Sequence, residues 1–132
     1  MEKYFEELSE GVTFNNGCST VIEGTYVDFE KIIPFLRSEK LSRKYIIIGL
    51  TYNDITEDKL FYNIKKYDTE DDWTYWVKDE DLKGDCRYFI ERNKYFDEKF
   101  KEYSIESYDT SEDRTKTIDK IMENLANEIK YI

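Results

Sequence analysis

The chain has 132 residues, a formal net charge of −10 and no histidine, and 38% of its residues are charged while 17% are aromatic. This length predicts one domain over residues 1–132, and the aromatic content favours a folded chain over a disordered one. Because histidine is absent, the usual general base and the usual nitrogen ligand of zinc or haem are excluded, and with them most metal-free hydrolase mechanisms. The negative charge disfavours direct binding to nucleic acid or to anionic membranes and favours a basic partner.

The first segments alternate between helix and turn signals. Apolar residues at helical spacing predict a short helix over residues 2–9. The pair Asn16-Gly17 readily adopts positive φ, so it predicts a turn between extended pieces at 12–14 and 20–22.

A capped helix and a strand are expected next. Asp28 is suited to cap a helix over the apolar residues that follow it, and Pro34 should kink this helix or divide it in two. Residues 45–52 are apolar at both alternating sets of positions, which predicts a central strand covered on both sides.

The middle of the chain alternates between apolar and polar residues. Residues 60–65 and 73–78 show this period of two, which predicts two strands of a hairpin joined by the acidic loop 68–72. After residues 79–81, apolar side chains recur at helical spacing, which predicts a helix with an inward face made of Leu82, Cys86, Phe89, Ile90 and Phe96.

The last third predicts a strand and then a helix. Alternation over 103–108 suggests a further long strand, and residues 109–111 offer caps for a final helix. The inward face of that helix is expected to be Ile118, Ile121, Met122, Leu125 and Ile129. The predicted fold class is therefore α+β, with an antiparallel-rich sheet of about four to six strands, helices packed on it and a C-terminal helix.

The densest chemical feature is acidic. Eight acids and two lysines between residues 68 and 85 give this stretch a net charge of −6. The predicted hairpin would separate loop 68–72 from turn 79–81 by roughly 20 Å. Three interpretations remain open: a solvated loop followed by a helix N-terminus, a docking surface for a basic partner, and a calcium site. The last lacks the glycine that an EF-hand loop needs at its sixth position, which is Trp73 when counted from Asp68.

Aromatic and sulfur residues leave further choices. Trp76 and Phe61 share strand faces with polar residues, so each is either an interface anchor or a core residue covered by a helix. Cys18 and Cys86 form no CxxC or metal-binding pattern, and both are expected to be reduced and buried. No cofactor, bound metal or catalytic residue is expected.

Two local stretches carry a resemblance. Phe14-Asn15-Asn16-Gly17-Cys18 and Val77 with the following Glu80-Asp81-Leu82, Cys86, Tyr88 and Ile90 are similar to stretches of immunity proteins that neutralise ribonuclease toxins. The chain as a whole, which is short, acidic, rich in tyrosine and lysine and without a catalytic motif, resembles immunity proteins of contact-dependent growth inhibition and related polymorphic toxin systems. The resemblance implies a cytoplasmic, non-enzymatic inhibitor that binds a toxin domain tightly and blocks its active site or an essential surface.

A nuclease active site is electropositive, so an acidic inhibitor is expected to be steered toward it. The toxin-binding candidates are Asp68, Glu70, Asp71, Asp72, Trp76, Asp79, Glu80 and Asp81, with the acids for steering and Trp76 as an anchor. The partner would be a basic nuclease domain, and the chain itself is taken as a monomer that contacts neither nucleic acid nor membrane. The alternatives are a phage-type anti-defence protein that mimics nucleic acid and a metal- or carboxylate-dependent enzyme.

Overall fold

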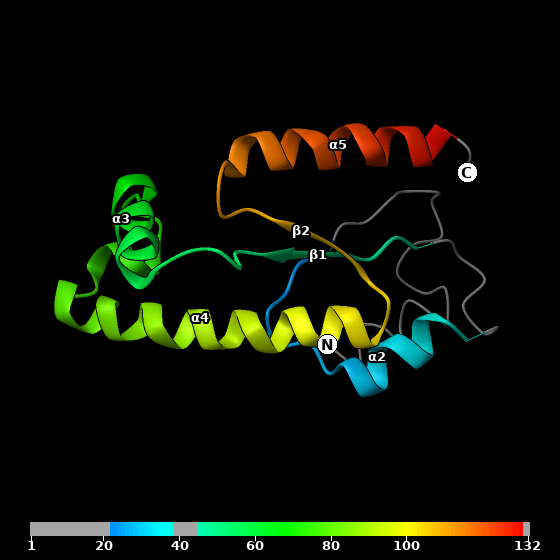
Figure 1. Cartoon of the computed structure of the whole chain (residues 1–132), viewed down its shortest axis with the longest axis horizontal. Coiled ribbons are helices and arrows are strands. Elements are labelled where there is room, and N and C mark those ends of the chain that lie inside the picture. Colours follow the sequence, from blue (N-terminus) through cyan, green and yellow to red (C-terminus); the bar gives the residue numbers. More distant parts are fainter. Residues whose placement is uncertain (1–21, 39–44, 131–132) are drawn as a thin grey trace. The chain divides into compact units, whose positions relative to one another are not determined.

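The structure, a computed structural model, describes residues 22–38 and 45–130 (Figure 1). The chain divides into two compact units at residues 1–46 and 47–132. The helix predicted at 2–9, the turn at Asn16-Gly17 and Cys18 lie outside the described residues. A single domain would require the two units to pack together, so the prediction of one domain stays a prediction.

In the first unit, the described secondary structure is helix α2, Phe29–Leu36. Asp28 caps it as predicted, because its side chain accepts a hydrogen bond from the Lys31 backbone amide at 3.3 Å. Pro34 lies inside the helix, which is not divided in two but ends two residues later. Proline removes one backbone hydrogen-bond donor from the helix. The last turn is nevertheless closed, because the Arg37 amide donates to the Ile33 carbonyl at 3.0 Å.

The described residues of the second unit, 47–130, form six elements in the order strand, helix, 3-10 helix, helix, strand, helix. They are β1 (Ile48–Thr51), α3 (Glu57–Tyr67), η1 (Trp73–Trp76), α4 (Asp79–Glu102), β2 (Glu106–Asp109) and α5 (Arg114–Lys130). The two strands are parallel, with Ile48 opposite Glu106 and Thr51 opposite Asp109. Figure 1 shows the strand pair between α4 and α5, and α4 packs on both strands while α5 packs on β2.

The predicted fold class is wrong. Within residues 22–38 and 45–130 the structure has one parallel pair of strands and is otherwise mostly helical, instead of an antiparallel sheet of four to six strands. Two helices and a turn separate β1 from β2 in sequence, and a crossover of this length allows strands to run parallel. Both strands are also shorter than the predicted segments 45–52 and 103–108.

The predicted hairpin is replaced by α3 and η1. In α3, Phe61 and Ile64 are half-buried at helical spacing, and the Thr56 hydroxyl caps the helix by accepting from the Lys59 amide at 3.2 Å. Acids in the first turn and the lysines Lys65 and Lys66 in the last turn also favour this helix. A pattern of only six residues fits both the strand period of two and the helix period of 3.6. Here the Thr56 cap and the charges at both ends of the segment favour a helix.

Both long helices form where they are predicted, and their inward faces agree with the prediction in part; the side chain of Ile129 lies outside the described residues. In α4, Leu82 and Cys86 are fully buried, and the helix continues to Glu102, so it also buries Phe100. In α5, Ile121 is buried, but Met122 is 61% exposed and does not belong to the inward face. The α5 cap is Asp113, not residues 109–111: its carboxylate accepts from the Lys116 amide at 2.9 Å.

β1 is packed tightly on one face and open on the other. A Cβ atom on Gly49 would lie 2.5 Å from two ring carbons of Phe100, so glycine is what allows α4 to approach this strand so closely. Thr51 is buried, whereas Leu50 is 50% exposed. The prediction that this strand is covered on both sides is therefore wrong for Leu50.

Candidate protein-docking site

The segment 68–81 contains all the predicted site residues, and its backbone folds back on itself instead of extending. The Thr74 hydroxyl donates to Asp68 Oδ1 at 2.8 Å, and the Trp76 indole Nε1 donates to the Glu70 carbonyl at 3.0 Å. A 3-10 helix rises about 2 Å per residue, so η1 spans far less than an extended strand. The predicted separation of the two acidic sets by a straight strand is therefore wrong, and they lie at either end of one short turn.

Three of the predicted acids are held by intramolecular bonds. Asp72 Oδ2 accepts from the backbone amide and the hydroxyl of Thr69, both at 2.9 Å, and these hydrogen bonds lower the pKa of the Asp72 carboxyl. Asp79 forms an ion pair with Lys65 of α3 at 2.9 Å. Asp68 is bonded through Oδ1, while its Oδ2 is buried and accepts no hydrogen bond from the described residues. These three acids stabilise the local fold.

The other four predicted acids are exposed. Glu70 and Asp71 lie just before η1, and Glu80 and Asp81 lie in the first turn of α4, where negative charge interacts favourably with the helix N-terminus. Among the described residues, none forms a hydrogen bond or an ion pair with any of these four carboxylates. The structure therefore separates the candidate acids into a bonded set and an unbonded, solvent-facing set.

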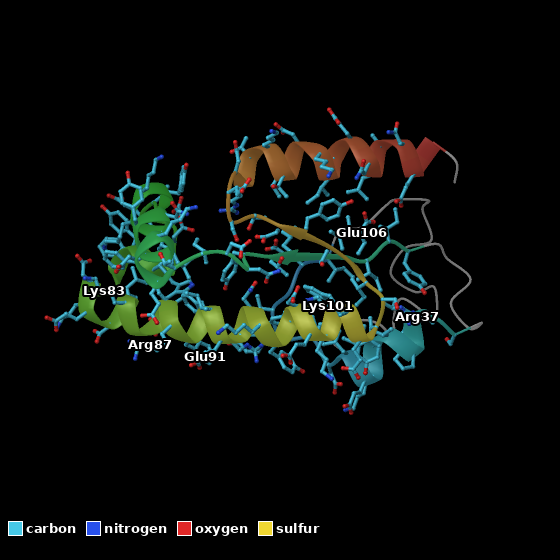
Figure 2. All side chains as sticks on the ribbon, viewed as in Figure 1. Arg37, Lys83, Arg87, Glu91, Lys101 and Glu106 are labelled. Atoms are coloured by element: carbon cyan, nitrogen blue, oxygen red, sulfur yellow. The ribbon has the colours of Figure 1, made fainter. Side chains whose placement is uncertain are left out.

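Most nearby cations are already used in packing α3 against α4. Arg87 pairs with Glu57 at 3.2 Å, and the Lys83 ammonium lies 5.2 Å from the centroid of the half-buried Phe61 ring. Figure 2 shows Lys83, Arg87 and Glu91 following one another along α4 from its amino-terminal end. Lys78 is exposed and has no bonded partner within the described part of the chain. The charge left unpaired around η1 is therefore mainly negative.

Three aromatic side chains of η1 are exposed beside these acids. We call Trp73, Tyr75 and Trp76 the η1 aromatic patch, and their exposed fractions are 62%, 43% and 70%. Trp73 packs against Phe89 of α4 with ring centroids 6.2 Å apart, and Tyr75 packs against Trp76 at 5.1 Å. Of the two readings left open for Trp76, the exposed one is correct, whereas Phe61 is half-buried between α3 and α4. The surface positions of Trp73 and Tyr75 were not predicted, because strand alternation assigned them to the opposite face.

A second polar cluster shows the opposite arrangement. We call Asn53, Asn93, Asp97, Asp109 and Ser111 the strand-end network, because they surround the carboxyl ends of β1 and β2. Buried Asn93 accepts from the Tyr52 amide at 2.9 Å and donates to Asn53 Oδ1 at 2.8 Å. Asp109 Oδ1 accepts from the amides of Asn53 at 3.2 Å and Ser111 at 2.9 Å. Each member bonds to another member, so this network fixes the loops after the strands.

Two further observations bear on the site. Within the described residues, no three histidine, cysteine or carboxylate side chains are grouped as a metal ion would require. In the same part of the chain, no helix combines the length and apolar character needed to cross a membrane.

Comparisons of the chain with protein-family models, with curated proteins and with solved structures give no match. The function is therefore argued from the geometry of the segment 68–81 and from the sequence.

Proposed function

We propose that this chain is an immunity protein that binds a cognate basic toxin domain, a nuclease, and neutralises it by non-covalent occlusion. The observation that supports the proposal is the set of four exposed carboxylates without intramolecular partners, Glu70, Asp71, Glu80 and Asp81, around the exposed ring of Trp76. Inhibition of this kind needs no catalytic residue, metal or cofactor, and the inhibitor acts in the cytoplasm, where such a toxin would be active.

Charge and aromatic surface have separate roles in this proposal. A nuclease site attracts polyphosphate, so its positive potential also attracts the unbonded carboxylates, which raises the association rate and orients the encounter. Tryptophan and tyrosine are enriched among the residues that dominate binding energy once water is excluded, and Trp76 is the most exposed member of the η1 aromatic patch. The bonded acids Asp68, Asp72 and Asp79 support the shape of the surface, and Asp72 and Asp79 are also exposed to a partner.

The test takes its candidate toxin from the genes that flank this chain's gene in the native genome, where the proposal expects a basic nuclease domain. The purified chain is added to that nuclease, and nucleic-acid cleavage and the association rate are measured at low and at moderate salt. We expect inhibition at a 1:1 ratio and an association rate that Asp71→Lys lowers at low salt, because the substitution reverses a steering charge.

The matched control is Asp119→Lys, which makes the same charge change at an exposed position of α5. It should leave the association rate close to that of the unaltered chain. Uninhibited cleavage at saturating protein would contradict the proposal. Inhibition of several unrelated nucleic-acid-binding proteins would instead favour the nucleic-acid mimic.

A further inference from the structure

We infer that the η1 aromatic patch binds arginine side chains of the basic partner, with a preference for guanidinium over ammonium groups. This inference rests on the proposed function, because it specifies the chemistry that the acidic surface recognises. Three observations support it: the ordered contacts of the rings, the absence of a described lysine or arginine over the tryptophans, and the carboxylates that flank them in sequence.

The rings of the patch are held in place while they remain exposed. Trp76 is fixed by its indole hydrogen bond to the Glu70 carbonyl and by Tyr75, whose ring meets it at 74°. Trp73 is fixed against Phe89, at an interplanar angle of 85°. Exposed rings that are already ordered lose little conformational entropy on binding, which favours them as anchors.

The chain places its own cations over other aromatic rings. Lys66 lies over Tyr67, Lys83 lies over Phe61, and Arg92 lies 5.1 Å from the centroid of Phe96. Among the described residues, no lysine or arginine lies over Trp73 or Trp76. Tryptophan has the face that attracts cations most strongly, and within residues 22–38 and 45–130 no cation of the chain itself lies over either tryptophan.

The unbonded carboxylates flank the rings along the chain. Glu70 supplies the carbonyl that holds the Trp76 indole, so the exposed side chain of Glu70 begins next to that ring. Asp71 follows directly, and Glu80 and Asp81 lie in the first turn of α4, a few residues after Trp76. A guanidinium group can stack on an aromatic face and donate two parallel hydrogen bonds to one carboxylate, whereas an ammonium group is a compact and strongly hydrated charge. A surface that combines tryptophan faces with free carboxylates therefore favours arginine.

Intrinsic fluorescence tests this inference directly, because Trp73 and Trp76 are the only tryptophans in the chain. The probes are acetylated, amidated tetra-arginine and tetra-lysine peptides, which carry the same charge and are titrated at the same ionic strength. We expect tetra-arginine to change the tryptophan emission and to bind about threefold or more tightly than tetra-lysine, as an exposed cation–π contact predicts.

Two variants locate the preference. Trp76→Leu should reduce the arginine preference to near one while leaving the charge-driven binding of both peptides. Trp76→Leu also removes the hydrogen bond to the Glu70 carbonyl. Tyr75→Leu is a second variant that leaves this hydrogen bond in place, and thermal unfolding checks that both variants fold. Tyr75→Leu should lower the preference for arginine without removing it.

The outcomes separate the two proposals. Equal, salt-sensitive binding of both peptides would overturn the arginine preference and leave the acidic docking surface in place. Binding of neither peptide at low salt would overturn both. A preference for arginine that is undiminished in both Trp76→Leu and Tyr75→Leu would overturn the assignment to the η1 aromatic patch.

Discussion

The strand-end network and the segment 68–81 contain the same kinds of polar side chain but use them in opposite ways. In the network, Asp97 and Asp109 accept hydrogen bonds from residues more than forty positions away in the sequence. In the segment, Glu70 and Asp71 face solvent without a described partner. An internally bonded carboxylate contributes to folding, whereas an exposed unbonded one remains available to another molecule. The number of acids in a stretch therefore does not show how many of them are available to another molecule; this depends on which carboxylates are bonded within the chain.

The largest effect on stability is expected in the core, at Leu82 of α4. Leu82→Ala should lower the free energy of unfolding by about 2–5 kcal/mol, because Leu82 is fully buried on α4 and the smaller side chain leaves a cavity. Urea unfolding followed by circular dichroism measures the change. Met122→Ala, at an exposed position of α5, is the control and should change stability by less than about 0.5 kcal/mol. Equal losses in the two variants would contradict the assigned faces of both helices.

The next effect tests whether the strand-end network is structural. Asn93→Ala leaves the Tyr52 amide and Asn53 Oδ1 without their buried partner, which should cost about 1–3 kcal/mol in unfolding free energy. Asn63→Ala on α3 is the matched control, since Asn63 is not bonded within the described residues. The same urea titration measures both variants, and an unchanged stability of Asn93→Ala would show that this network does not hold the loops.

The third prediction is a pH dependence. Hydrogen bonds from Lys101 and, more weakly, from Asn53 hold the pKa of the Asp97 carboxyl below its usual range, although partial burial opposes the shift. The stability from ionised Asp97 is therefore fully present above the unfolded-state pKa of about 3.9 and is lost as the pH falls through the lower folded-state pKa. Compared with Asp97→Asn, the unaltered chain should be more stable near neutral pH, and this advantage should shrink in acid.

Urea unfolding at a series of pH values between 7 and the acid transition measures this advantage. The exposed α5 variant Asp119→Asn corrects for the loss of one negative charge from the whole chain. An advantage that is constant across the series would show that the Lys101 and Asn53 bonds do not favour the ionised form.

The smallest effect on stability is expected in the segment 68–81. Asp71→Lys should change the free energy of unfolding by less than about 0.5 kcal/mol, because the Asp71 side chain is exposed and bonds to none of the described residues. Urea unfolding checks this value beside the association measurement on the same protein. A loss comparable to that of Asn93→Ala would mean that Asp71 belongs to the folding network, and the contrast between the two regions would fail.

The sequence predicted the parts of the fold that depend on strong periodicity over many residues. The apolar stripe of α4 and the cap of α2 at Asp28 were correct, since several turns or a side-chain cap specify them locally. The alternation over residues 60–65 predicts a strand, but six residues fit the helical period as well. Thr56 and the charges at both ends of α3 already indicate a helix. For the candidate site, composition identified the acids but could not separate bonded Asp72 and Asp79 from exposed Asp71.

By itself, the sequence determined the net charge, the absence of histidine chemistry, the apolar stripe of α4 and the concentration of acids between residues 68 and 85. The tertiary structure alone decided that β1 and β2 run parallel, that η1 turns its tryptophans toward solvent, and which carboxylates are bonded. The physical reason is the range of the interactions. Helical faces and caps depend on residues three or four positions apart, whereas the hydrogen bond from Tyr52 to Asn93 joins residues 41 positions apart, which no local pattern specifies.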